Sequence, residues 1–236
     1  YNLNPDFNPR DIVGDNPEDY NDSNYGNNDY EGPDALHGTH VAGIIAANRT
    51  NDKGIKGVAD NVRIMTVRCV PDGDERDKDI ANAIYYAVNN GASIINMSFG
   101  KSYSPGKAAV DAAMRYAADH DVLLVHAAGN DSENNDSDPN FPNDMYAKPL
   151  KKGLFKKEKN VPSWIEIGAL SFKKDENRVA KFSNFGKKNV DLFSPGVQIY
   201  ATVPDGKYKN LQGTSMASPA AAGVAAIIRS YYPELS

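Results

Sequence analysis

The amino-acid sequence predicts an α/β fold in three layers, with a parallel sheet between two layers of helices. Short apolar runs alternate with segments of helical spacing. Strands that are apolar on both faces are typical of a parallel sheet covered by helices. The expected elements, in chain order, are a helix at 38–47, a strand at 62–70, a helix at 77–89, a strand at 93–97, a helix at 106–120, strands at 122–126, 165–170 and 190–193, and a helix at 215–232.

The helices are predicted from periodicity and composition. In the segment 77–89, Ile80 and Ile84 recur at a spacing that places them on one helical face. The segments 106–120 and 215–232 are rich in alanine, which has the highest helix propensity. Because ligands of such sheets bind at the carboxyl ends of the strands, we expect the functional residues at that edge.

Charge divides the chain into two parts. Residues 1–36 contain seven Asp, two Glu and one Arg, a net charge of −8, so the remaining residues carry +3 of the total of −5. We interpret residues 1–36 as a long acidic loop region, rich in Asn and Asp, and residues 37–236 as the folded domain. The absence of a basic stripe predicts no nucleic-acid partner. Apolar runs are too short for a membrane span, and the single cysteine, Cys69, is interpreted as a core residue.

A histidine stands just before a small-residue helix in His37-Gly38-Thr39-His40-Val41-Ala42-Gly43. Its imidazole can lie at a strand-to-helix edge, and we expect Gly38, Ala42 and Gly43 to let the helix pack closely on its neighbours. Two histidines three residues apart also fit a zinc site. Such a site needs further ligands, for which the acidic segment is a source.

Two further segments offer a nucleophile and an oxyanion donor. Ser215, in Gly213-Thr214-Ser215-Met216-Ala217-Ser218-Pro219, stands at a predicted helix start, where backbone N–H groups and the helix dipole favour a developing negative charge. The alternative is a simple N-cap. Asn130 follows a predicted strand in Ala127-Ala128-Gly129-Asn130, where an amide can donate to an oxyanion; the alternative is an asparagine in a turn.

A fourth segment, Asn96-Met97-Ser98-Phe99-Gly100, is a predicted strand that runs into a glycine turn. Its backbone can pair with an extended peptide. Together and in this order, the four segments resemble the subtilisin-like serine peptidases, or subtilases, from about Leu36 to the end of the chain. The resemblance implies the subtilisin-like fold, secretion or a place in the cell envelope, and hydrolysis of protein or peptide substrates through an acyl-enzyme on Ser215.

The resemblance also assigns roles. His37 would be the general base, Ser215 the nucleophile, and Asn130 would share the oxyanion hole with the Ser215 N–H. His40 would be structural, and His126 a packed strand residue or, alternatively, a residue at the cleft edge. The pocket for the residue before the scissile bond would have one wall formed by Ser98, Phe99 and Gly100 and the opposite wall formed by Ala127, Ala128 and Gly129.

The stretch 131–159 interrupts the alternation of helices and strands. It is polar at first and basic from Lys148 to Lys159. We interpret it as a solvated surface excursion; the alternative is a role in rimming the substrate cleft. The resemblance places the base of the pocket in this stretch, so substrate preference is not predicted.

The resemblance lacks the catalytic aspartate. Subtilases carry it in an Asp-Ser/Thr-Gly triplet after a first apolar strand, and this sequence contains no such triplet. Either the aspartate lies just before Tyr1, since Asn4-Pro5-Asp6-Phe7 resembles the stretch that follows it, or residues 1–36 end a large insertion between aspartate and histidine. Asp6, Asp11 and Asp15 are not followed by the Ser/Thr-Gly turn of that triplet, so none of them is assigned as the catalytic aspartate. By the resemblance, the domain at 37–236 is expected to be truncated at both ends.

Calcium is a second expectation from the resemblance, because family members often bind it near the loop after the histidine helix. Asn51 and Asp52 offer oxygen ligands, Asp6 could add a carboxylate, and the positive charge of Lys53 weakens the site.

The peptidase chemistry implied by the resemblance requires no cofactor. Two alternatives to an endopeptidase remain: a non-catalytic, protein-binding relative on the same scaffold, and an esterase, which the lack of a Gly-x-Ser-x-Gly turn at Ser215 disfavours.

Overall fold

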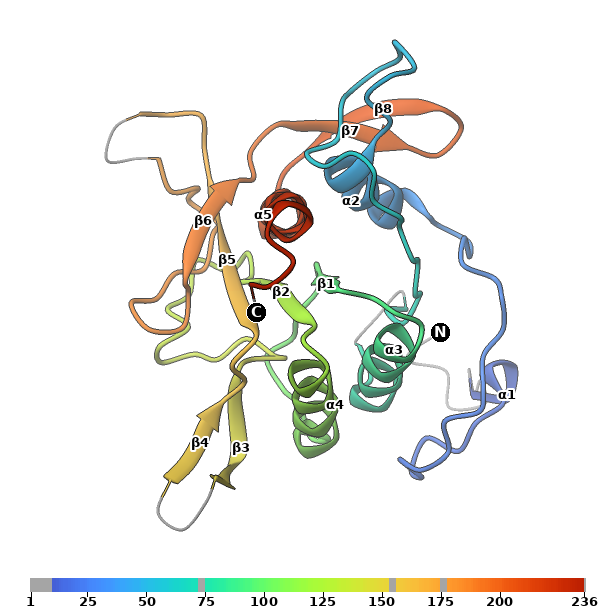
Figure 1. The fold of residues 1–236 in the computed structure, drawn as a ribbon, viewed down its shortest axis with the longest axis vertical. Helices are drawn as coiled ribbons and strands as arrows, with labels where there is room; N and C mark the ends of the chain where they lie inside the picture. Colours follow the sequence, from blue (N-terminus) through green and yellow to red (C-terminus); the bar gives the residue numbers. More distant parts are fainter. Residues whose placement is uncertain (1–9, 72–74, 153–155, 175–177, 236) are drawn as a thin grey trace.

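A computed structural model describes residues 10–71, 75–152, 156–174 and 178–235, and it shows an α/β fold built on one parallel sheet (Figure 1). The sheet has four strands in the order β1-β2-β5-β6, and all neighbours run parallel. The strands are β1 (Ile94–Met97), β2 (Leu123–Ala127), β5 (Trp164–Leu170) and β6 (Leu192–Pro195). The predicted fold class is confirmed.

Helices cover both faces of the sheet, as Figure 1 shows. Leu124 of β2 belongs to a core cluster with α3 (Asp77–Asn89) and α4 (Lys107–Asp119), whereas its neighbour Val125 packs in a second cluster with α5 (Thr214–Tyr231). Successive side chains of a strand point to opposite faces, so these two clusters are the two interfaces of a three-layer fold.

An antiparallel hairpin packs against the helix α2 (Leu36–Ala46). It consists of β7 (Ile199–Val203) and β8 (Lys207–Leu211), which the sequence did not predict. A Cβ on Gly43 would collide with the side chain of Thr202 in β7, so the predicted close packing is confirmed at Gly43. The same expectation is wrong at Gly38, where a Cβ would meet nothing within 4 Å.

The basic part of the stretch 131–159 forms a second hairpin. Its strands are β3 (Met145–Lys152) and β4 (Lys156–Asn160), and it projects from the body of the molecule beside α4 (Figure 1). Sequence patterns did not predict this hairpin because lysine has a low strand propensity. Its place at the surface agrees with the predicted solvated excursion.

The strand predicted at 62–70 is wrong. This segment has no regular secondary structure, and no backbone–backbone hydrogen bond of residues 60–71 is found within the described residues. A strand requires a neighbouring ladder, and β1, the edge of the sheet, pairs only with β2. Ile64 and Met65 are consequently 45% and 41% exposed. The nearby Cys69 is only partly buried and is not among the core residues of the described chain, so its predicted core position is not confirmed. Desolvation raises the pKa of its thiol.

The described part of the acidic segment is attached to α3 by ion pairs. It contains the short helix α1 (Arg10–Val13). The Arg10 guanidinium lies 2.5 Å from a carboxylate oxygen of Asp15 and 2.8 Å from one of Asp79, and Lys78 lies 2.6 Å from Asp15. These charges are largely buried, so removing one partner would leave the other unpaired in the interior.

Within the described chain, no helix is both long and apolar enough to cross a membrane.

Candidate active site

Helix α5 begins at the carboxyl edge of the sheet and presents Ser215 there. Gly213, the residue before the helix, has φ = 151°, which disfavours a side chain. The motif contains two serines, and their surroundings separate them. Ser218 is fully buried, and its hydroxyl donates to Oδ1 of Asn96 at 2.8 Å. Ser215 is only partly buried, so it is the serine that a substrate can reach.

Two hydrogen bonds join Ser215 to the segment after β1. The Ser98 hydroxyl donates to the Ser215 carbonyl oxygen at 2.9 Å, and the Ser215 hydroxyl donates to the Ser98 carbonyl oxygen at 3.2 Å. In addition, Asn96 Nδ2 donates to the Ser98 hydroxyl oxygen at 2.9 Å. The predicted nucleophile and the predicted peptide-binding segment are therefore adjacent.

Asn130 lies on the other side of the helix start. Its Oδ1 accepts from the backbone N–H of Thr214 at 2.9 Å and from the Thr214 hydroxyl at 3.1 Å. Only the oxygen of an amide can accept from an N–H, so these bonds fix the orientation of the side chain. They leave Nδ2 as a donor near the backbone of Gly213, because a Cβ there would lie 3.7 Å from this nitrogen.

His37 lies in the first turn of α2 and is exposed. In the described part of the chain, no hydrogen bond joins it to Ser215 or to a carboxylate. Desolvation by neighbouring atoms, and secondarily the charge of His40, lower the pKa of His37. An imidazole without a hydrogen-bonded acid has no group to hold one tautomer or to stabilise its charged form.

His40 is fully buried. Its Nε2 lies 3.1 Å from the Ile199 carbonyl oxygen and 3.0 Å from that of Lys209, so it joins α2 to both strands of the β7–β8 hairpin. This is the structural role implied by the resemblance. The zinc alternative is wrong for the described residues, among which no group of three or more His, Cys, Asp or Glu is placed to hold a metal.

The two predicted pocket walls flank an asparagine that sequence reasoning missed. Asn140 donates from Nδ2 to the Ala127 carbonyl oxygen at 3.1 Å, and its amide fills the space beside Gly100. Ala127 and Ala128 are buried, so only Gly129 is partly exposed in that wall. Only the resemblance, which places the pocket base within 131–159, pointed to this region. No pattern singled out Asn140.

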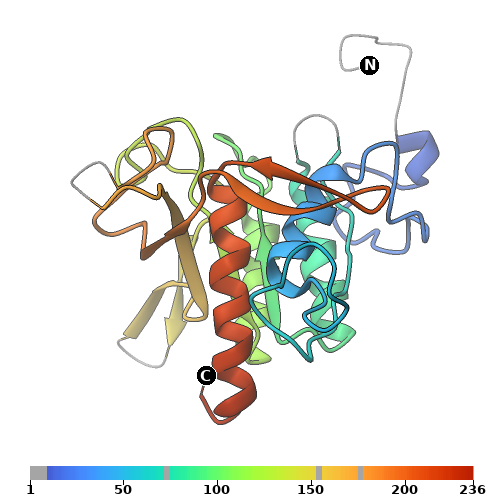
Figure 2. The same cartoon turned by 90° about the horizontal axis from the view of Figure 1, so that it is seen from above.

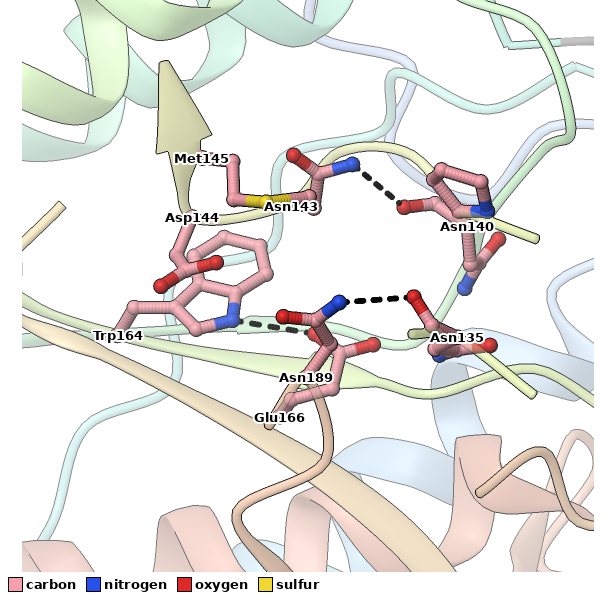
Figure 3. Close-up of a pocket in the computed structure, with 9 residues that line it drawn as sticks. Asn135, Asn140, Asn143, Asp144, Met145, Trp164, Glu166 and Asn189 are labelled. Atoms are coloured by element: carbon pink, nitrogen blue, oxygen red, sulfur yellow. Dashed lines mark hydrogen bonds between the residues drawn. The ribbon is translucent and has the colours of Figure 1, made fainter. Parts of the chain in front are cut away.

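A polar pocket lies next to Asn140 (Figure 3). Asn140, Asp144, Trp164 and Glu166 are among the residues that line it. Glu166 is buried and accepts from Trp164 Nε1 at 3.1 Å; its two carboxylate oxygens each lie 3.0 Å from Nδ1 of His126. His126 is fully buried, so it is a packed strand residue, as predicted.

None of the unassigned aspartates is shown beside His37. Asp15 is held by Arg10 and Lys78, whose hydrogen bonds lower the pKa of its carboxyl although burial opposes that shift. Asp11 lies in α1, within the segment that packs on α3. Asp6 lies outside the described residues.

The predicted calcium ligands form no assembled site. Asn51 Oδ1 accepts from the backbone N–H of Lys53 at 3.1 Å, so this oxygen is used by its own turn. Asp52 supplies the only carboxylate of the four-residue stretch 51–54, and Asp6 lies outside the described residues. Calcium prefers six to eight oxygen ligands. The described loop does not supply that many oxygen ligands by itself, and calcium binding stays a prediction.

Comparison with known proteins agrees with this geometry. The family model described as "Subtilase family" matches residues 2–236. A thermophilic serine proteinase of Bacillus sp. (strain AK1) is 40% identical over 86% of this chain and 45% of its own length, and subtilisin DY of Bacillus licheniformis is 36% identical over 85% and 65%.

Among solved structures, the one named Sphericase is similar with a TM-score of 0.70 and 29% identity, over 85% of this chain and 65% of that one. A cold-adapted subtilisin-like serine proteinase is similar with a TM-score of 0.64 and 33% identity, over 83% and 62%. The chain thus spans less than two thirds of the length of each of these four proteins.

Proposed function

We propose that this chain, which belongs to the subtilase family, is the part of a serine endopeptidase that supplies its base, nucleophile and oxyanion donor. One observation carries the proposal most directly: Thr214 holds the oxygen of Asn130, which leaves the amide nitrogen as a donor beside the Ser215 helix start. A non-catalytic protein has no need for such a donor at the end of a strand.

The chemistry follows from these positions. Ser215 Oγ attacks the scissile carbonyl carbon while His37 takes its proton, and the negative oxygen is stabilised by Asn130 Nδ2 and the Ser215 N–H. For this step the Ser215 hydroxyl must turn from the Ser98 carbonyl oxygen, which it now contacts, toward His37. His37 then donates this proton to the amine, which leaves. In the second half of the reaction His37 takes a proton from water, the water oxygen attacks the acyl-enzyme carbonyl, and Ser215 is released with the proton that His37 returns.

The substrate backbone would lie along the segment 98–100. Ser98 is tied to the start of α5 by its hydroxyl, which keeps this segment close to Ser215. An extended peptide that pairs with it has its scissile bond near the nucleophile and its preceding side chain between the two walls. The substrates are therefore proteins or peptides in extended conformation.

We expect the third member of the triad to lie on a further strand. Within the described residues, the segment 62–70 makes no backbone–backbone hydrogen bond and β1 pairs only with β2. Unpaired N–H and C=O groups on such edges favour an added strand. We place the missing aspartate on that strand, either before Tyr1 or ahead of an insertion that residues 1–36 would end.

We place the whole protein outside the cell or in its envelope, following the resemblance to subtilisins. A single cysteine is compatible with that compartment and does not require it. One relative, 36% identical, is named major intracellular serine protease and comes from Bacillus subtilis (strain 168). Fractionation of the native host with an antibody to this chain decides between the two locations.

A fluorophosphonate label tests the function on the full-length protein. We expect one label per molecule on Ser215, together with hydrolysis of an unfolded protein substrate that the label abolishes. A full-length protein that folds, contains the aspartate and takes no label would instead be the non-catalytic, protein-binding relative.

A further inference from the structure

The β3–β4 hairpin concentrates positive charge in an otherwise acidic chain. Residues 145–160 contain one acidic residue, Glu158, and carry a net charge of +5, whereas the whole chain carries −5. The charge comes from lysines alone, namely Lys148, Lys151, Lys152, Lys156, Lys157 and Lys159.

The register of the hairpin places like charges opposite each other. Lys151 pairs with Lys157 and Lys152 with Lys156 across the two strands. Directly opposed like charges destabilise an antiparallel pair. No ion pair is found for Lys148, Lys151, Lys157 or Lys159, whose surroundings the structure describes. Among the described side chains, no carboxylate pairs with Lys151 or Lys157 to relieve the repulsion between them.

The hairpin is nevertheless fastened to the domain. Leu150 packs against the core cluster under α4, and Glu158, its cross-strand partner, accepts a hydrogen bond from Arg115 of that helix. The next pair, Lys151 and Lys157, points to the opposite side because strand side chains alternate. Both are exposed, as is Lys159, two residues beyond Lys157. The result is a row of lysines on the outer face of an anchored ribbon.

This face lies away from the catalytic edge. In Figure 2 the hairpin lies at the level of the C-terminal half of α5, whereas Ser215 lies in the first turn at the other end of that helix. A surface that holds the hairpin therefore leaves the substrate cleft open.

We propose that the lysine face of the β3–β4 hairpin docks the protein on an anionic lipid surface. Lysine is a compact point charge that suits a diffuse negative surface, whereas paired recognition of single phosphates favours arginine. Each basic residue near an anionic bilayer adds to the attraction, which acts within about a Debye length of the surface. Lipid headgroups would also relieve the repulsion between Lys151 and Lys157. This inference does not depend on the proposed peptidase activity.

Vesicle co-sedimentation with the full-length protein tests the proposal. At about 0.1 M salt we expect binding to phosphatidylglycerol vesicles and none to phosphatidylcholine vesicles. The variant Lys151→Gln/Lys157→Gln/Lys159→Gln should bind about 100-fold more weakly, since each lysine near the surface contributes about fivefold. The matched control, Lys173→Gln/Lys174→Gln/Lys181→Gln, removes the same charge from exposed positions elsewhere and should bind like the parent.

Further readouts separate docking from misfolding. The hairpin variant should melt no lower than the parent, because it removes a repulsion, and the triple change to arginine should retain binding. The proposal is overturned if the parent does not bind anionic vesicles, if both triple glutamine variants bind equally, or if DNA or polyglutamate binds the hairpin more tightly than the vesicles do.

Discussion

Thr214 donates two hydrogen bonds to Oδ1 of Asn130, from its backbone N–H at 2.9 Å and from its hydroxyl at 3.1 Å. In the full-length enzyme we expect Asn130→Ala to lower kcat about 10²–10³-fold with little change in KM, because the donated bond forms only in the transition state. This magnitude is the one known for the same donor in subtilisin and is carried over. Asn130→Asp keeps the shape of the side chain but removes its N–H donor, so it should lower kcat as much as Asn130→Ala does. A change in KM with kcat preserved would contradict the assignment.

Ser215→Ala in the full-length enzyme should abolish turnover and leave peptide binding nearly intact. The reason is that the segment 98–100 binds the substrate backbone and takes no part in the bond changes. Binding of a fluorescent peptide to the variant, measured by anisotropy, checks this expectation. Ser218→Ala is the matched control; it removes the buried hydroxyl bonded to Asn96 and should reduce stability more than it reduces kcat per folded molecule.

The 236-residue chain expressed alone should be at best a very poor peptidase. No aspartate is shown to orient His37, and losing that residue alone costs about 3 × 10⁴ in kcat in subtilisin. In the described part of the chain, β1 and the segment 62–70 have no further backbone neighbour, which adds to the loss. Active-site titration with a fluorophosphonate measures the outcome. Stoichiometric labelling with ordinary turnover would show that an aspartate of this chain, such as Asp6 or Asp11, completes the triad.

His37 should titrate below the ordinary histidine value of about 6.5 in this chain, because desolvation and then the charge of His40 lower its pKa. Between the folded and unfolded values, the unfolded chain binds more protons. The free energy of unfolding therefore rises with pH across that window and falls as pH is lowered through it. NMR titration of the imidazole, compared with His37→Gln, checks the sign; a pKa above 6.5 would reveal a carboxylate partner.

Calcium binding is tested on the full-length protein by its melting temperature. If the loop at 51–54 takes up calcium with ligands from another segment, a chelator should lower the melting temperature, and added calcium should restore it. Asp52→Asn should remove this response, whereas Asp205→Asn, a change at an exposed site on the β7–β8 turn, should not. An unchanged melting temperature in chelator would exclude the site.

Local patterns predicted most of the sheet and its covering helices. The segments around β1, β2 and β5 are apolar enough to be buried on both faces, and α3 shows its inner face in the spacing of Ile80 and Ile84. The segment 62–70 has the same apolar character but forms no strand. Strand formation depends on a partner elsewhere in the chain, which residue types cannot reveal.

By itself, the sequence determined the family, because four motifs in a fixed order are too specific to arise from composition. It also singled out His37, Asn130 and Ser215. Only the tertiary structure decided which of Ser215 and Ser218 is reachable, which atom of Asn130 is left to donate, and that Asn140 lies between the pocket walls. These facts depend on contacts between residues 13 to 122 positions apart. Long-range packing sets burial and hydrogen-bond direction, and a linear pattern does not contain either.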